Sequence, residues 1–252
     1  MTERLEGIYR YPVKGLSAES LEGVRLEEGR PMPGDRRFAI AHGTANFDAN
    51  DPKWLPKQNF LILANEERLA QLETRFDPES EVLTIFRAGK QVAKGKTSDI
   101  MGRTLIGQFF AGFMRGEVRG TPRLIEARGF TFADTPENVL SVVNLASVED
   151  LDRVIRQPVN PLRFRANLLI SGFQPWAERS WIGKCLSIGE VRLKVVEEIE
   201  RCAATNVNPE TAARDLNIPL SLKKGYRHMN MGVYAEVVSG GELTAGAKVS
   251  LD

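Results

Sequence analysis

The sequence predicts a mainly β protein with a few helices, of the α+β class. Short apolar or alternating segments recur along the 252 residues, and glycine or proline turns separate most of them. Only a few segments carry apolar residues at helical spacing. Many short strands with few helices are typical of a β-barrel or β-sandwich with appended helices.

The first half is expected to contain short strands and two helices. Apolar residues at helical spacing predict helices over 65–72 and from Ser98 onward, with Ser98 or Asp99 as the N-cap of the second. We expect the apolar stripe of that second helix to pack in the core: Leu105, Ile106, Phe109, Phe110 and Phe113. Strands are predicted at 7–13, 24–26 and 37–41, with a hairpin formed by 82–86 and 91–93.

The second half has the same mixed character. Ser147 is predicted to cap a helix that runs to about Ile155, because Asp150 follows it three residues later. A glycine-, proline- and arginine-rich stretch at 116–137 is the best candidate for a domain boundary, so we expect two domains, 1–120 and 121–252. Strands are predicted at 139–143, 168–170, 191–195, 233–237 and 247–251.

Composition excludes several classes of protein. Lysine and arginine total 34 and aspartate and glutamate total 33, so the net charge is +1, which excludes a globally basic nucleic-acid binder. No run approaches about 18 consecutive apolar residues, so no membrane span is expected. The first residues lack the apolar stretch of a secretory signal, and two cysteines cannot form a disulfide scaffold. We therefore expect a cytoplasmic protein without a nucleic-acid partner.

Common catalytic and metal-binding motifs are absent. The sequence contains no dinucleotide-binding glycine motif, no P-loop, no H-E-x-x-H and no G-x-S-x-G. Two histidines cannot form a histidine-rich metal site, and the two cysteines, Cys185 and Cys202, are not in C-x-x-C spacing. Apolar neighbours predict that Cys185 is a core thiol.

Cys202 is the most informative residue. It is expected on the loop after a strand that ends near Ile199, with the cation of Arg201 directly before it. The thiolate is the form that attacks or binds metal, and thiolate sulfur suits soft metals. The segment 208–211 predicts the start of a short helix whose free N–H groups could orient an anion. The alternative for Cys202 is an inert buried thiol.

Segment 201–211, R-C-A-A-T-N-V-N-P-E-T, resembles the R-C-x-x-T-x-V-x-P-x-T-G signature of MOSC domains. These domains occur at the C-terminus of molybdenum cofactor sulfurases and in the amidoxime-reducing component. The resemblance spans nearly the whole chain in the family's order, and Gly15, Ala166 and Ala212 depart from the family's usual residues. Further similar segments are Y-P-V-K-G at 11–15, D-R-R-F at 35–38, F-R-A-N at 164–167, and the Glu178 and Trp181 pair.

The resemblance implies a MOSC-type β-barrel preceded by a smaller, β-rich N-terminal domain. It also implies binding of the molybdenum cofactor, a pterin with a terminal phosphate and a dithiolene, with Cys202 as the metal ligand or sulfur-carrying residue. Arginine and lysine suit phosphate, and amides suit the pterin edge. The implied cofactor-binding residues are Lys14, Arg37, Arg165, Asn167, Asn144, Ser147, Arg201 and Thr205, with Arg36 and Arg163 as neighbours that could take the place of the matched arginines.

The function implied is that of an oxidoreductase that reduces N-hydroxylated or similar small molecules. No iron–sulfur segment and no flavin or nicotinamide fingerprint is present, so electrons would come from a separate iron–sulfur or flavin reductase. One alternative is a sulfur carrier with a persulfide on Cys202, or a module that delivers the cofactor; another is a non-catalytic β domain. Pyridoxal phosphate is not expected, because the desulfurase of the sulfurases is a separate fold.

Overall fold

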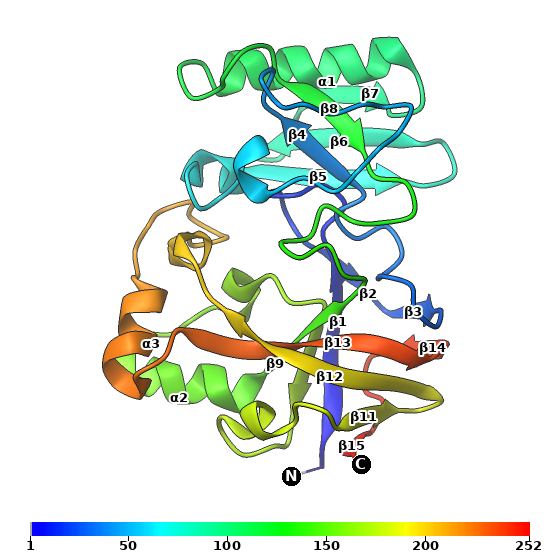
Figure 1. Ribbon diagram of the computed structural model, residues 1–252. Helices are drawn as coiled ribbons and strands as arrows, with labels where there is room; N and C mark the ends of the chain where they lie inside the picture. The colour runs from blue at the N-terminus through cyan, green and yellow to red at the C-terminus, as the bar shows by residue number, and fades with distance from the viewer. Residues whose placement is uncertain (1) are drawn as a thin grey trace.

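An eight-stranded sheet is the largest element of the computed structural model, which describes residues 2–252. Strands β9 and β10 are parallel, and every other neighbouring pair is antiparallel. The first strand of the chain thus lies inside a sheet formed mostly by the second half (Figure 1). In spatial order the strands are β15 (Val249–Leu251), β11 (Cys185–Ile188), β12 (Val191–Glu200), β13 (Asn230–Ser239), β9 (Leu140–Asn144), β10 (Leu168–Ser171), β1 (Arg4–Arg10) and β2 (Glu19–Leu21).

Strand β12 shows why one face of this sheet is buried. Val191, Leu193 and Val195 are buried while Arg192 and Lys194 between them are exposed, which is the period of two that a strand imposes. The buried side chains pack with those of β1, β9, β10 and β13 in one core. Beyond Val195 the pairing of β12 with β13 shifts register twice. Such bulges bend a strand, and here they precede the loop that holds the cysteine of the signature.

A second lobe lies above the large sheet (Figure 1). Helix α1 (Ile100–Phe113) contacts β7 and β8 there, and Asp99 caps it by accepting a hydrogen bond from the backbone N–H of Gly102. The lobe has its own core, which includes Phe38, Leu83 and Phe110. Its strands are β4 (Phe38–Ala41) paired with β8 (Arg123–Glu126), and the three-stranded sheet β5 (Leu72–Asp77), β6 (Val82–Arg87) and β7 (Lys90–Lys96).

Two helices lie beside the large sheet and contact each other (Figure 1). Helix α2 (Leu145–Ile155) begins after Asn144, whose side chain accepts from the N–H of Ala146, and α3 (Ile218–Tyr226) begins after Asn217. The pair β3 (Gly23–Leu26) and β14 (Gly241–Thr244) completes the strands. Short 3₁₀ helices occupy Lys57–Asn59, Glu67–Gln71, Pro161–Phe164, Ala177–Ser180 and Ala203–Asn206.

The predicted α+β class is confirmed, but three predictions of helix position or capping are wrong. The helix expected over 65–72 is a 3₁₀ turn followed by β5, because the alternating burial of β5 begins at Leu72. No helix begins at Asn208; its side chain instead accepts from the N–H of Glu210 at 2.9 Å and closes a turn. Ser147 lies inside α2, where Asn144 is the cap.

The apolar stripe of α1 packs as expected at Ile106 and Phe110, which are fully buried. Leu105 differs, since 46% of it is exposed. Cys185 is half-buried and free, so it is not the fully buried thiol that its neighbours predict. Within residues 2–252, no helix combines the length and apolarity needed to cross a membrane. The division at residue 120 stays a prediction.

Candidate functional site

A cavity of about 560 Å³ lies between the two lobes and contains most of the candidate residues. Its walls come from the β1–β2 connection, residues 62–64, the loop 133–139, the segment 163–167 and the end of β12. Segments far apart in the sequence therefore form one site. Of the residues the sequence singles out, Lys14, Arg36, Arg163, Arg165, Asn167, Arg201, Cys202 and Thr205 line the cavity, whereas Arg37, Asn144 and Ser147 do not.

Cys202 lies two residues beyond the end of β12, on the loop that the sequence predicts. Its thiol is free and half-buried. Its carbonyl accepts hydrogen bonds from the backbone N–H of Thr205 at 3.1 Å and from the Thr205 hydroxyl at 2.9 Å. Thr205 therefore holds the turn that presents the thiol to the cavity.

Arg201 is 8% exposed and has no carboxylate partner within the described part of the chain. Its Nε donates to the carbonyl of Met231 and its Nη1 to that of Phe164, both at 2.8 Å. Its Nη2 has no partner. Burial lowers the pKa of Arg201 to about 10, so the side chain remains a cation at neutral pH with one donor unused.

Arg165 is a second cation with an unused donor. It takes left-handed backbone with φ of 51°, and its Nη1 donates to the Leu16 carbonyl at 2.7 Å. Its Nη2 is buried without a partner, and its guanidinium lies 4.2 Å from the centroid of the Tyr11 ring. Burial lowers the pKa of Arg165 to about 10. Arg165 and Arg201 thus line one cavity, each with a free guanidinium donor.

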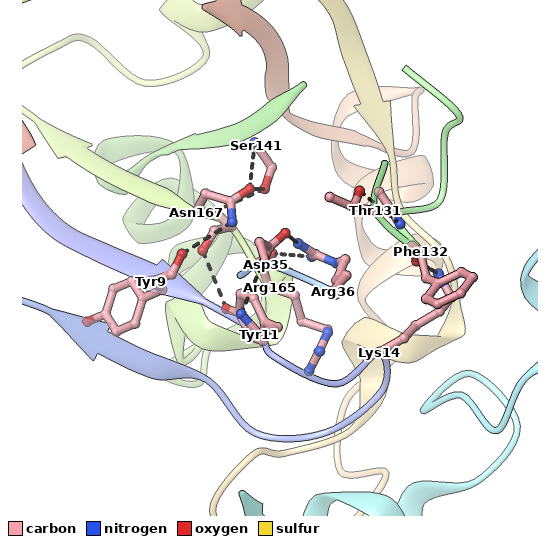
Figure 2. A network of polar contacts seen from close by, with 12 residues as sticks. Tyr9, Tyr11, Lys14, Asp35, Arg36, Thr131, Phe132, Ser141, Arg165 and Asn167 are labelled. Atoms are coloured by element: carbon pink, nitrogen blue, oxygen red, sulfur yellow. Dashed lines mark hydrogen bonds and ion pairs between the residues drawn. The ribbon is translucent and has the colours of Figure 1, made fainter. Parts of the chain in front are cut away.

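Arg36 links the N-terminal segment to Arg165 (Figure 2). Its Nη2 donates to the Arg165 carbonyl at 2.9 Å, its Nη1 pairs with Asp35, and Asp35 also accepts from the backbone N–H of Tyr11 at 2.8 Å. Burial lowers the pKa of Arg36, but Asp35 outweighs that effect and the pKa lies above its usual value. The charge of Arg36 is therefore compensated within the chain.

Lys14 lies in the β1–β2 connection and contacts the segment at the start of the loop 133–139. It is 5% exposed, and its ammonium donates to the Phe132 carbonyl at 2.8 Å and to Asp134 at 2.6 Å. Burial lowers the pKa of Lys14, although Asp134 opposes this shift. Burial also raises the pKa of Asp134, but Lys14 outweighs it and the pKa falls to about 2. The two groups form an ion pair at neutral pH.

Arg163 and Asn167 line the cavity, and most of their side-chain polar groups already have partners within the protein. The Nε of Arg163 is the exception, because it is buried without a partner. Arg163 forms two hydrogen bonds to the Asp215 carboxylate, at 2.6 and 2.8 Å. The Asn167 carbonyl accepts from the N–H and hydroxyl of Ser141 at 3.0 and 2.9 Å, and its amide donates to the Tyr9 carbonyl at 3.2 Å (Figure 2). Asn167 therefore ties β9, β10 and β1 together beneath the cavity.

The other three candidates lie elsewhere. Arg37 directly precedes β4 and pairs with Glu126 at 2.6 Å, beside a separate hollow. Asn144 and Ser147 donate to Glu178 at 3.1 and 2.8 Å, in a buried cluster where burial raises the pKa of the Glu178 carboxyl. Any role for these three at the cavity would have to be indirect.

The cavity also contains charged residues that the sequence reasoning did not select. The acidic run at the end of β12, shortly before Cys202, is the signal that would have found half of them, because residues at the end of one strand lie close together. Tyr11 holds Arg165 although it lies outside the cavity lining. The additional charged lining residues are Lys57, Asp134, Glu137, Glu197, Glu198 and Glu200.

The site therefore combines a soft sulfur with buried cationic donors. Free guanidinium N–H groups suit a phosphate or another polyoxygen anion, and thiolate sulfur suits a soft metal. Among residues 2–252, no group of three or more His, Cys, Asp or Glu side chains is placed to hold a metal ion.

Two family models match the chain. Residues 2–113 match the MOSC N-terminal beta barrel domain, and residues 129–250 match the MOSC domain. Together they include the cysteine, both unpartnered arginines and the lysine of the cavity.

Individual proteins also match parts of this sequence. The mitochondrial amidoxime-reducing component 1 of Mus musculus is 41% identical over 86 residues, which cover 34% of this chain and 25% of the relative. The molybdenum cofactor sulfurase of Caenorhabditis elegans is 32% identical over 256 residues, covering 96% of this chain and 35% of the relative. The matches thus span about a quarter to a third of these relatives. A crystal structure of the YUAD protein from Bacillus subtilis aligns over 100% of this chain and 96% of that chain, with a TM-score of 0.44 and 14% identity.

Proposed function

Because the chain belongs to the MOSC family, we propose that it binds the molybdenum cofactor in the cavity between its lobes and acts as an oxidoreductase. The substrates are N-hydroxylated or similar N–O compounds, and a separate iron–sulfur or flavin protein supplies electrons. The observation that carries this proposal is that Cys202 lines one cavity with Arg165 and Arg201, each of which has one guanidinium nitrogen without a partner. The names of the relatives support the choice of cofactor and substrate.

The residues present fit this cofactor. A buried donor without a partner costs about 1–3 kcal/mol, and Arg165 and Arg201, which both line the cavity, each have one such nitrogen. The guanidinium of either arginine would suit a terminal phosphate, and Cys202 would provide a thiolate ligand to molybdenum. When bound, the cofactor supplies the electron chemistry, and the protein supplies binding, orientation and a water-poor environment.

Residues of the chain itself would position the groups that bind the cofactor. Tyr11 and Asp35 hold Arg165 and Arg36 in place, and Thr205 holds the backbone of Cys202. The overall reaction converts R–NH–OH, two electrons and two protons into R–NH₂ and water. Electrons come from the partner protein and protons from solvent, so atoms and charges balance.

A second candidate function follows from the sulfurase relative, whose match covers 96% of this chain. The half-buried free thiol of Cys202 would then carry a persulfide, or the cavity would hold the cofactor for delivery to another enzyme. Both functions use the same cysteine, so the bound species distinguishes them.

The test is the molybdenum content of protein expressed in a host that makes the cofactor. Elemental mass spectrometry should find stoichiometric molybdenum in the wild type and in the matched control Cys185→Ser. It should find none in Cys202→Ser, whose thermal unfolding should be nearly unchanged. Molybdenum retained in Cys202→Ser would refute the ligand assignment. Persulfide on Cys202 without metal would favour the second function.

A further inference from the structure

The chain leaves the loop that holds Cys202, forms α3 and returns to the same loop. At the start, the Asn206 side chain accepts from the backbone N–H of Ile218, the first residue of α3, at 2.9 Å. After the helix, the Met229 carbonyl accepts from the backbone N–H of Arg201 at 2.9 Å. Arg201 directly precedes Cys202, so both ends of the α3 segment are tied to the cysteine loop.

The C-terminal ends of α2 and α3 lie together in space. A Cβ atom on Gly225 of α3 would lie 3.0 Å from a methyl carbon of Val154 in α2. The Tyr226 hydroxyl donates to the Asp150 carboxylate of α2 at 2.7 Å. The residues that end the two helices therefore share one face of the protein.

This face carries unpaired positive charge. Each helix ends on an arginine with left-handed backbone, Arg156 with φ of 61° and Arg227 with φ of 65°, where glycine is usual. Lys223 and Lys224 occupy the last turn of α3. All four side chains are exposed and form no ion pair among residues 2–252. Together these four residues form the cationic face.

Few acids oppose the cationic face. The sequence of α3 contains no acidic residue, and of the three acids of α2 Glu149 is exposed. Asp150 pairs with Arg153 at 2.9 Å. Asp152 accepts from the backbone N–H of Val159 at 2.9 Å. The negative ends of the two helix dipoles favour cations here, and the four side chains remain free to bind an acidic partner.

Three half-buried rings lie beside the cationic face. The ring centroids of Trp176 and Tyr226 are 4.1 Å apart, and those of Trp176 and His228 are 5.5 Å apart. The Trp176 indole N–H donates to Asp150 at 2.8 Å, and its backbone is left-handed with φ of 64°. Tryptophan, tyrosine and arginine are the residue types that most often dominate the binding energy of protein interfaces.

The ring cluster is also close to Cys202. His228 directly precedes the residue whose carbonyl accepts from Arg201, so no more than about 13 Å separates the Cα atoms of His228 and Cys202. A second connection uses Asn230, whose backbone N–H donates to His228 Nδ1 at 3.2 Å. The Asn230 amide also donates to Glu198, which lines the cavity. An electron that enters at this face therefore has a short path to the cavity.

We propose that the cationic face docks an acidic iron–sulfur protein that donates electrons to the site at Cys202. This inference rests on the proposed function and identifies where its electron donor binds. Opposite charges steer two proteins together and set their orientation, and small interfaces are usual for electron-transfer pairs. A plant-type [2Fe–2S] cluster gives one electron at a time, so two reduced donors are oxidised for each N–O compound reduced.

The test compares two electron donors for the molybdenum-loaded protein, a reduced plant-type ferredoxin and reduced methyl viologen, with benzamidoxime as substrate. The triple variant Lys223→Glu/Lys224→Glu/Arg227→Glu should lower kcat/KM for the ferredoxin by about 10- to 100-fold, because it repels an acidic donor. The rate with viologen should not fall. High salt should remove most of the difference between variant and wild type by screening.

The triple variant Lys90→Glu/Lys94→Glu/Lys96→Glu is the matched control, because it makes the same change of charge on exposed residues of β7 in the other lobe. It should keep nearly the wild-type ferredoxin rate, and both variants should keep the molybdenum content and thermal unfolding of the wild type. Equal ferredoxin rates in the two triple variants would overturn the docking surface and leave the proposed function intact. A wild type that accepts electrons from viologen but not from ferredoxin would do the same.

A failure of the proposed function is seen separately. If the loaded protein reduces no benzamidoxime with viologen, the reductase function is wrong. The cationic face is then judged by calorimetric binding of oxidised ferredoxin at low salt. Binding that the variant of the face loses and the β7 control keeps supports it; equal binding by both, or none by the wild type, overturns it. Phosphatidylglycerol vesicles bound in place of ferredoxin would identify a lipid-facing surface and also overturn it.

Discussion

The guanidinium of Arg165 lies 4.2 Å from the centroid of the Tyr11 ring, and that of Arg36 lies 4.9 Å from the same centroid. An aromatic face attracts cations, so one ring stabilises two positive groups that would otherwise repel each other. Tyr11 is 1% exposed and its hydroxyl donates to the Ala166 carbonyl at 3.4 Å. The ring therefore organises the cationic side of the cavity before any ligand binds.

Replacing this ring should weaken cofactor retention. A cation–π contact contributes about 0.5–2 kcal/mol, so we expect Tyr11→Leu to lower the pterin and molybdenum retained after gel filtration by about 3- to 10-fold. Tyr11→Phe keeps the ring and should retain nearly wild-type amounts. Equal losses in the two variants would show that the hydroxyl, and not the aromatic face, is what the site requires.

Arg165→Lys should also reduce cofactor retention. Lysine keeps the charge but loses the planar set of donors, and the loss of one charge-assisted hydrogen bond weakens binding by about tenfold. Arg128→Lys is the matched control, because Arg128 is exposed and lies outside the cavity lining. Pterin fluorescence of the purified variants measures how much cofactor each retains. Equal retention in both variants would show that Arg165 does not bind the cofactor.

The Lys14–Asp134 pair should make part of the stability depend on acid pH. The pKa of Asp134 is about 2 in the folded protein against an ordinary 3.8, so the unfolded chain binds more protons between these values. The contribution is present above pH 4 and is lost as the pH falls towards 2. Urea unfolding of the wild type should show the free energy of unfolding fall between pH 4 and 2. The variant Asp134→Asn should be less stable at neutral pH and should lack this part of the pH dependence.

Asp51→Asn provides the control for this experiment. Asp51 pairs with Lys53 on the surface, where both side chains are more than two-thirds exposed. We expect its removal to change neither the neutral stability nor the acid limb measurably. An acid limb that Asp134→Asn leaves unaltered would contradict the depressed pKa.

Ala212→Gly should stabilise the protein slightly. Ala212 occupies the position where the MOSC signature usually has glycine, and its φ of 58° is left-handed. Left-handed backbone costs a non-glycine residue about 1–2 kcal/mol, and glycine's extra freedom in the unfolded chain offsets about 0.4–1 kcal/mol of that. We expect a net gain of about 0.5 kcal/mol in the free energy of unfolding. The adjacent Ala213→Gly should lower it, because its φ is not positive.

Local sequence patterns predicted the secondary structure correctly where it depends on residues close together in the sequence. The Asp99 cap of α1 and the strands β4, β6 and β9 follow from capping and alternation within a few residues. The loop position of Cys202 follows from the end of the alternating pattern of β12. The prediction over 65–72 was wrong because a few residues at helical spacing also fit a 3₁₀ turn next to a strand. The prediction at 208 was wrong because an asparagine followed by proline closes a turn as readily as it caps a helix.

Local patterns could not predict which of Arg36 and Arg37 lines the cavity. Both arginines lie in the same D-R-R-F segment, and either would suit an anion. Arg36 has left-handed backbone, with φ of 45°, and lines the cavity, while Arg37 pairs with Glu126. Asp35, Tyr11 and Arg165 set this arrangement, and Arg165 is 129 residues away from Arg36.

The sequence by itself determined the candidate cysteine, the candidate cations and the family resemblance, because a signature and an alternating strand are local properties of the chain. Only the tertiary structure decided which cations line the cavity with Cys202, which of them lack acidic partners, and which carboxylates share the lining. It also placed β1 beside β10, far from its neighbours in sequence. The physical reason is that burial, charge compensation and left-handed backbone at a site depend on contacts between distant segments, which exist only after both lobes have packed.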